Sequence, residues 1–144
     1  MIKDFVQAWD ANKSKLESYM RTHNTDEFAE DYEALVRLLF TIVINPYLDE
    51  KHGDSFVFLT GKITVIDNGD YQGTQLFIIP RDTYQPSEDD YVMTYVYYGS
   101  CSCCDTLLAI TEYGSHELPN DVQVSELMTL CLHLLQRCVY PFDV

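Results

Sequence analysis

The residues best suited to chemistry in this chain lie in one segment, residues 99–105, which reads Gly-Ser-Cys-Ser-Cys-Cys-Asp. Cys101 and Cys104 form a C-x-x-C pair, a spacing that brings two thiolates to the same side of a turn, where they can bind one zinc ion. The sequence holds no second C-x-x-C pair and no H-x-x-x-H. The remaining ligands would therefore come from distant parts of the chain, and the role of Cys103 stays open.

Asp67, Asp70 and His133 are the candidates for those remaining ligands. The Asp-Asn-Gly-Asp sequence at 67–70 is a strong hairpin-turn signal, and its two carboxylates flank the turn. If the strand that ends at Tyr98 runs antiparallel beside residues 74–80, this turn lies close to the cysteines. Ordinary turn chemistry is the alternative role for both acids. His133 interrupts an apolar helix and would need a polar partner if buried, whereas a solvated histidine needs none.

The same cysteines allow a redox interpretation. Thiols at a helix N-terminus have a lowered pKa, and C-x-x-C is also the spacing of disulfide exchangers. The flanking residues here are Ser and Asp, not the Trp-Cys-Gly-Pro context of those enzymes. A purely structural segment without metal is a third interpretation.

The other cysteines and histidines are predicted to be structural or superficial. Cys131 and Cys138 fall on an apolar helical stripe, where a free cysteine behaves as a small buried apolar residue. Three histidines fall in polar connecting segments and are expected at the surface: His23, His52 and His116.

The common hydrolase and nucleotide-binding motifs are missing from the sequence. It contains no G-x-x-x-x-G-K-[ST], G-x-G-x-x-G, H-E-x-x-H or G-x-S-x-G. A metal-bound water remains the enzymatic possibility, if only three protein side chains hold the ion.

The formal charge of −14 arises from 23 acids and 9 bases, with the acids concentrated in residues 25–54 and 88–90. Such a surface repels phosphate, so we expect no direct binding to nucleic acid or to an anionic membrane. It attracts a basic protein surface, including one that itself binds nucleic acid. Solubility alone is the simpler explanation of the same charge.

The chain has no apolar run of about 18 residues and no secretory signal pattern at its start. Its five cysteines are an odd number, and three are crowded into four positions, which suits a reducing compartment better than a disulfide framework. We expect a cytoplasmic location, in the host cell.

Periodicity predicts four helices and three strands. Asn24 with Glu27 resembles a capping box that begins the second helix, and Asn45-Pro46 is expected to end it. Residues 80–90 form a polar loop, the best candidate for a mobile segment. The predicted helices cover residues 3–21, 28–43, 106–114 and 122–139, the last being the most buried, and the predicted strands cover 56–66, 74–79 and 91–98.

This order lacks the alternation of strands and helices that a parallel sheet requires. We therefore predict an α+β fold: a three-stranded or slightly larger antiparallel sheet packed by two N-terminal helices and a buried C-terminal helix. The length fits a single domain over residues 1–144.

Two blocks, residues 67–74 and 97–107, resemble a family of small phage and prophage proteins with a Tyr-Gly-Ser-Cys-Ser-Gly-Cys-Asp core. Residues 127–136 are similar to the C-terminal helix of that family. This chain departs from the core at Cys103, where the family has Gly. The resemblance implies that Cys101, Cys104 and His133 are ligands.

A phage origin gives the acidity a use, and the chain is similar in size and character to anti-CRISPR proteins. The leading hypothesis is a non-enzymatic, zinc-stabilised acidic protein that binds a basic surface of a host defence protein. The best guess for that partner is a type II CRISPR effector nuclease, whose nucleic-acid loading is blocked. Two alternatives are a metal-dependent hydrolase or thiol redox enzyme using Cys101 and Cys104, and a structural or regulatory phage protein without metal.

Overall fold

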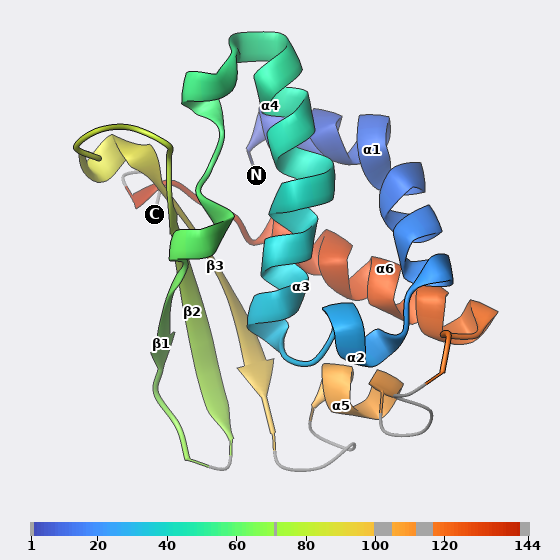
Figure 1. The fold of residues 1–144 in the computed structure, drawn as a ribbon. Helices are drawn as coiled ribbons and strands as arrows, with labels where there is room; N and C mark the ends of the chain where they lie inside the picture. The colour runs from blue at the N-terminus through green and yellow to red at the C-terminus, as the bar shows by residue number, and fades with distance from the viewer. Residues whose placement is uncertain (1, 71, 100–104, 112–116, 142–144) are drawn as a thin grey trace.

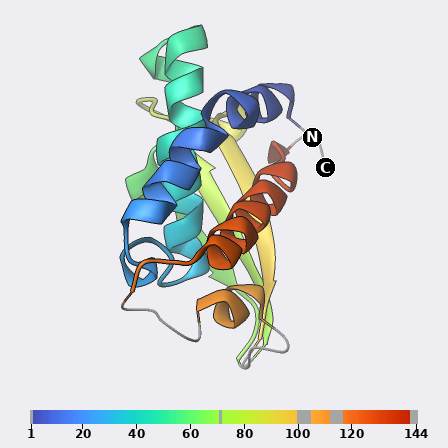
Figure 2. The ribbon, with the colours of Figure 1, turned by 90° about the vertical axis from the view of Figure 1, so that its right-hand side faces the viewer.

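A computed structural model describes residues 2–70, 72–99, 105–111 and 117–141 of the chain. The predicted α+β class is confirmed: a three-stranded antiparallel sheet lies on one side of the molecule, and the longer helices pack against one of its faces (Figure 1). The view turned by 90° shows the same arrangement, with helices in front of the sheet (Figure 2).

The elements follow one another with short connections. The strands are β1 (Thr64–Asp67), β2 (Gly73–Pro80) and β3 (Tyr91–Tyr98). The helices are α1 (Lys3–Thr22), α2 (Thr25–Phe28), α3 (Tyr32–Leu39), the π-helical turn η1 (Phe40–Ile44), α4 (Asn45–His52), α5 (Thr106–Thr111) and α6 (Asp121–Gln136). Three short 3-10 turns complete the list: η2 (Asp54–Phe56), η3 (Thr60–Lys62) and η4 (Glu88–Asp90). None of the helices in the described ranges combines the length and apolarity needed to cross a membrane.

The first helix forms where it was predicted. Its apolar positions recur every three or four residues and bury Phe5, Leu16 and Met20 completely. One buried polar side chain interrupts this face, because Asn12 donates from Nδ2 to the carbonyl of Val43 at 2.9 Å. That bond joins α1 to the π-helical turn η1.

The predicted second helix is wrong at its start, because it is split in two. Asn24 precedes α2, but its side chain makes no capping hydrogen bond. The backbone leaves helical geometry at Ala29, and Asp31 begins α3 by accepting from the N–H of Ala34 at 2.8 Å. In a continuous helix the N–H of Ala34 would bond a backbone carbonyl one turn earlier. The Asp31 carboxylate takes the place of that carbonyl, which favours the start of a separate helix here.

The predicted end of that helix is also wrong. The chain passes through Asn45-Pro46 without stopping and continues as α4 to His52. Proline has no N–H and its ring crowds the carbonyl four residues earlier, which normally breaks a helix. Here the π-helical turn precedes it: the N–H of Asn45 bonds the carbonyl of Phe40, five residues back, and this wider turn accommodates Pro46.

The sheet has the order β1-β2-β3, and β2 pairs with β3 from Gly73 opposite Tyr98 to Pro80 opposite Tyr91. The predicted strand 56–66 is largely wrong, since only residues 64–67 are a strand. Before it the chain forms η2 and η3. Phe58 pairs with Arg81 only in an isolated bridge, and its side chain is fully buried against Phe5 and Phe40, with ring centroids 6.0 and 5.6 Å apart.

The C-terminal helix lies close to its predicted range and packs beside β3. Cys131 and Cys138 are completely buried, as predicted. The expectation that this helix is the most buried one is not met, because α3 buries five of its 8 residues and α6 six of its 16. The chain after α6 pairs with the edge of β3, where Met93 and Val139 form an isolated bridge.

Candidate functional site

The candidate site is the end of the sheet at which β3 stops. The register places Tyr98 opposite Gly73, so the 67–70 turn lies beside Tyr98, as the antiparallel arrangement predicts. The Tyr98 hydroxyl donates to Asp67 Oδ1 at 2.5 Å and lies 2.8 Å from the carbonyl oxygen of Gly69. The predicted proximity of the hairpin to the residue that precedes the cysteine segment is therefore confirmed.

Asp67 acts in this structure as the anchor of its own hairpin. Its Oδ1 also accepts from the N–H of Gly69 at 3.1 Å, and its Oδ2 accepts from Gln75 Nε2 at 3.1 Å. The hydrogen bond from Tyr98, followed by the one from Gln75, holds the pKa of Asp67 below its usual value. The same contact raises the pKa of Tyr98 to about 12, because the phenol is stabilised as a donor to a carboxylate.

Asp70 behaves differently from Asp67. Its side chain is exposed, and among the described residues it makes no side-chain hydrogen bond. Its charge contributes to the raised pKa of Tyr98, so it lies near that hydroxyl. Of the two predicted carboxylate ligands, Asp70 keeps more of its oxygen lone pairs open to an ion.

Asp105 is the residue that sequence reasoning missed. It is 9% exposed, and its Oδ1 accepts from the Tyr32 hydroxyl at 2.6 Å and from the N–H of Leu108 at 3.0 Å. Its Oδ2 accepts from the N–H of Gly99 at 3.0 Å. The Tyr32 hydroxyl in turn accepts from the N–H of Leu107 at 3.0 Å. One carboxylate therefore joins α3, the end of β3 and the first turn of α5.

A sequence signal for this role exists. Asp105 stands immediately before Thr106, at the position from which an aspartate caps a helix by accepting an N–H three residues later. Burial, and after it the hydrogen bond that Tyr32 donates to Asp105, raise the pKa of Tyr32 well above its usual value. The Tyr32 hydroxyl thus stays protonated as the donor to this carboxylate.

The predicted metal ligands Cys101 and Cys104, with Cys103 between them, lie outside the described residues. The residues on either side of them are fixed, because the bond between Gly99 and Asp105 closes the segment at its base. A hollow of about 240 Å³ adjoins the same base, between Tyr32, Gln75, Tyr98, Gly99 and Asp105.

Among the described site residues, the structure does not place His133 beside Asp67, Asp70 or Tyr98. His133 is exposed on α6, next to Leu134, whose carbonyl accepts from Thr94 Oγ1 at 2.7 Å. Thr94 precedes Tyr98 by four residues, which corresponds to roughly 13 Å along a strand. Among the described residues, no three of His, Cys, Asp and Glu are grouped so that they could hold a metal ion.

The remaining histidines differ in their surroundings. His52 is exposed, as predicted, and its Nε2 lies 3.0 Å from Asp4 Oδ2. His23 is half-buried, because its ring stacks on Tyr19 with centroids 3.8 Å apart. His116 lies outside the described residues.

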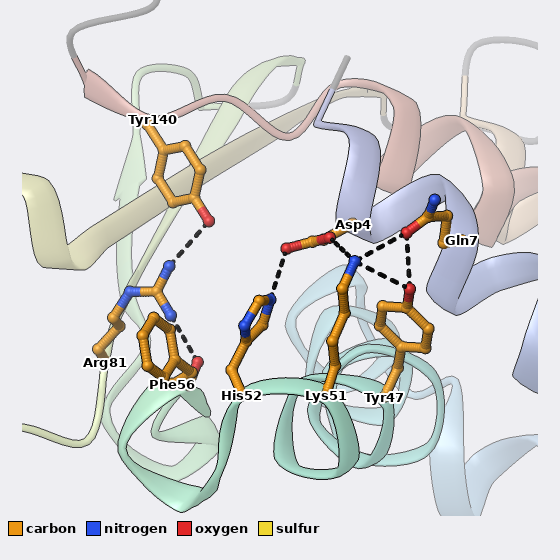
Figure 3. Close-up of polar contacts among 8 residues, drawn as sticks. All are labelled: Asp4, Gln7, Tyr47, Lys51, His52, Phe56, Arg81 and Tyr140. Carbon is orange, nitrogen blue, oxygen red and sulfur yellow. Dashed lines mark hydrogen bonds and ion pairs between the residues drawn. The ribbon is translucent and has the colours of Figure 1, made fainter.

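A second polar cluster lies at the opposite end of the molecule, where α4 meets the start of α1 (Figure 3). Asp4 accepts from Lys51 Nζ at 2.9 Å and faces His52, and the hydrogen bond from Lys51 is the main reason that the pKa of Asp4 lies below its usual value. The Tyr47 hydroxyl donates to Gln7 at 2.6 Å. These side chains satisfy one another, which is the arrangement of a structural tie between two helices.

Arg81 makes a similar tie beside that cluster. Its guanidinium donates to the carbonyl of Phe56 at 2.6 Å and to the Tyr140 hydroxyl at 2.9 Å. It also lies over the ring of Phe58, 4.7 Å from the centroid. The contact holds the C-terminal end of the described chain against the sheet (Figure 3).

The two described cysteines are unsuited to nucleophilic chemistry. Burial raises the pKa of both Cys131 and Cys138 to about 12, so both thiols are protonated near neutral pH. A reactive cysteine needs the thiolate and access to solvent, and neither thiol has them. Any thiol chemistry of this chain therefore belongs to the 100–104 segment.

Comparison with known proteins adds no relative: the chain matches no protein-family model, no curated protein and no solved structure.

Proposed function

We propose that this chain is a non-enzymatic acidic protein of a phage or prophage that binds a basic surface of a host defence protein and inhibits it in the host cytoplasm. The partner that fits best is a type II CRISPR effector nuclease, and inhibition blocks the loading of nucleic acid. A zinc ion held by Cys101 and Cys104, with Asp70 as a further candidate, stabilises the fold at the end of the sheet.

The observation that carries this proposal is the charge of −14 on a chain of 144 residues. The acids are displayed: Glu27 and Glu30 are exposed around α2, and Asp49 and Glu50 are exposed on α4. Like charges held this close repel one another, and a surface of lysine and arginine relieves the repulsion. Complementary charge speeds encounter with such a surface and disfavours other partners.

A nuclease that loads guide and target strands has a basic surface of the kind that this acidic chain would bind. Nucleic-acid channels are lined with lysine and arginine that contact phosphates, and this contact depends strongly on salt. Carboxylates spaced along α2 and α4 offer the same sign of charge as a phosphate backbone. Occupation of the channel by this chain would exclude the nucleic acid by direct competition.

The zinc ion has a structural role in this proposal. When bound, it supplies a cross-link between the 100–104 segment and its surroundings. The chain's own contribution is the bond from Gly99 to Asp105, which ties together the residues on either side of that segment. Asp67 keeps the hairpin beside it through Tyr98.

The test is binding to the host's purified, guide-free type II effector nuclease at about 50 mM and about 300 mM salt. Charge-driven docking predicts that the Kd rises at least about tenfold across this range. Glu27→Gln combined with Glu30→Gln is expected to weaken binding, whereas Asp10→Asn on α1, also an exposed acid, serves as the control. Absence of binding, or binding indifferent to salt, contradicts the proposal.

A further inference from the structure

The sheet has a second face, and none of its outward-pointing strand residues is charged. Val92, Thr94 and Val96 of β3 are buried under the helices, so the residues between them point the other way. The register carries this alternation across the sheet, because Leu76 stands opposite Tyr95 and Ile66. We name as the outer sheet face the side chains of Ile66, Leu76, Ile78, Met93, Tyr95 and Tyr97.

Three of these side chains are exposed, and Leu76, Ile78 and Met93 are half-buried. Tyr97 is 63% exposed, Ile66 49% and Tyr95 37%. In the described part of the chain, the long helices all lie on the other side of the sheet (Figures 1 and 2). The solvated face of an antiparallel sheet normally carries polar residues, and a continuous apolar patch marks an interaction site.

The chemistry of the face is that of a protein interface. Tyr95 and Tyr97 pack edge to face with centroids 5.7 Å apart. The guanidinium of Arg137 lies over the ring of Tyr95, 5.3 Å from its centroid, and Met93 adjoins them. Tyrosine, methionine and arginine are the residue types enriched at the centre of interfaces, where they contribute most of the binding energy.

Acids stand at both ends of this face. At the hairpin end lies Asp70, and at the opposite end, in the connection between β2 and β3, lie Asp82, Glu88 and Asp89, all of them exposed. Two copies of the chain stacked through this face would place acids against acids in either orientation. The charge of −14 on each copy opposes the pairing further.

We propose that the outer sheet face is the docking surface for the basic partner, which presents an apolar centre between clusters of lysine and arginine. The apolar side chains fill the centre of the interface, and the acids at both ends of the sheet pair with the partner's rim. This inference rests on the proposed function and adds to it the surface through which binding occurs. The acids of α2 and α4 lie outside this face and add a longer-range attraction of the basic partner.

The test places a lysine on the outer sheet face and on a matched site elsewhere. Tyr97→Lys and Ile66→Lys introduce a charge into the face. The controls Val122→Lys and Leu118→Lys alter side chains that are 65% and 56% exposed near the start of α6, so exposure and charge change are comparable. Thermal unfolding of each variant checks that it is folded.

A photo-cross-linking amino acid at position 97, or at 122 as the control, is incorporated into the chain in host cells, and cross-linked proteins are identified by mass spectrometry. We expect one basic protein from position 97 and none from 122. Tyr97→Lys should raise the Kd for that purified protein by about tenfold or more, and Val122→Lys by less than about twofold.

The outcomes separate the inference from the proposed function. A basic partner that tolerates Tyr97→Lys but is lost with Glu27→Gln and Glu30→Gln overturns the docking surface and leaves the function standing. Cross-links from position 97 to a second copy, equal cross-links from both positions, or none from 97 also overturn the docking surface. A neutral or acidic partner that binds through position 97 without salt dependence contradicts both the basic partner of the docking surface and the proposed function.

Discussion

The N–H of Gly99 and the carboxylate of Asp105 meet at 3.0 Å and close the base of the segment that contains Cys101 and Cys104. The same carboxylate is fixed by the Tyr32 hydroxyl at 2.6 Å. The residues on either side of that segment are therefore held at a point where α3, β3 and α5 converge.

Replacement of Asp105 should destabilise the protein strongly. Asp105→Ala leaves three donors without their acceptor, the buried Tyr32 hydroxyl and the partly buried N–H groups of Gly99 and Leu108. Hydrogen bonds to a charged group are worth about 1.5–3 kcal/mol each when one partner is lost. We expect a loss of about 3 kcal/mol, or about 10 °C in Tm. Urea unfolding measures the loss, and Asp10→Ala, which removes an exposed carboxylate on α1, should change stability by less than about 0.5 kcal/mol. Equal effects of the two variants would contradict the role given to Asp105.

If Cys101 and Cys104 hold a structural zinc ion, their replacement should lower both zinc content and Tm, whereas a change in the core should lower Tm alone. Cys101→Ser combined with Cys104→Ser should abolish zinc in the purified protein and lower its Tm, since a structural ion contributes its binding energy to folding. Cys131→Ala removes a buried core side chain and should lower Tm while zinc stays bound.

Elemental analysis of the untagged protein and its variants gives the metal content. Absence of zinc from the purified protein would contradict the proposed metal site. A double serine variant that keeps its Tm and loses a hydrolytic or redox activity would favour the enzymatic alternative instead.

The buried thiols should resist alkylation. Because burial raises the pKa of Cys131 and Cys138 to about 12, both are protonated at about pH 8, and both lack contact with solvent. Treatment of the native protein with iodoacetamide should leave them unmodified, and treatment in denaturant should label both. Peptide mass spectrometry distinguishes the sites. Rapid native labelling of Cys131 would show that α6 is not packed as described.

The contact between Tyr98 and Asp67 predicts a dependence of stability on pH at both extremes. The lowered pKa of Asp67 stabilises the fold above its unfolded value of 3.8, and this contribution is lost as pH falls through the folded value. The raised pKa of Tyr98 acts in the opposite sense: its contribution is complete below 10.0 and is lost as pH rises towards about 12.

Tyr98→Phe tests this dependence. The variant should have a lower Tm than the original protein near neutral pH, and the difference should shrink in acid and in alkali. Tyr84→Phe is the control, because Tyr84 is 96% exposed. A Tm difference that stays constant from acid to alkali would contradict the assignment.

The parts of the fold that follow from local pattern were predictable. Helix α1, the strands β2 and β3 and most of α6 follow from apolar periodicity. The Asp-Asn-Gly-Asp signal located the hairpin, but the predicted two-residue turn is wrong, because Asp67 pairs with Gln75 and the connection is longer. The errors have tertiary causes. The π-helical turn before Pro46 and the burial of Phe58 depend on contacts between distant segments, which periodicity does not report.

The candidate site divides in the same way. The placement of Asp67 near Tyr98 followed from the predicted antiparallel pairing of β2 and β3, which brings the hairpin to the end of β3. The bond between Tyr32 and Asp105 joins residues 73 positions apart, and only the packing of α3 against the end of β3 reveals it. The uncharged outer sheet face was readable in the alternation of β3, but its exposure depended on which face the helices cover.

Competition between this acidic chain and nucleic acid for a host nuclease can be measured by varying the order of addition in a DNA-cleavage assay. The purified protein is added to the host's type II effector nuclease either before or after guide RNA and target DNA are loaded. If the chain blocks nucleic-acid loading, we expect loss of cleavage when the protein is added first and little effect when it is added last. Cleavage should recover as salt rises. Full cleavage in both orders of addition would contradict the proposed competition.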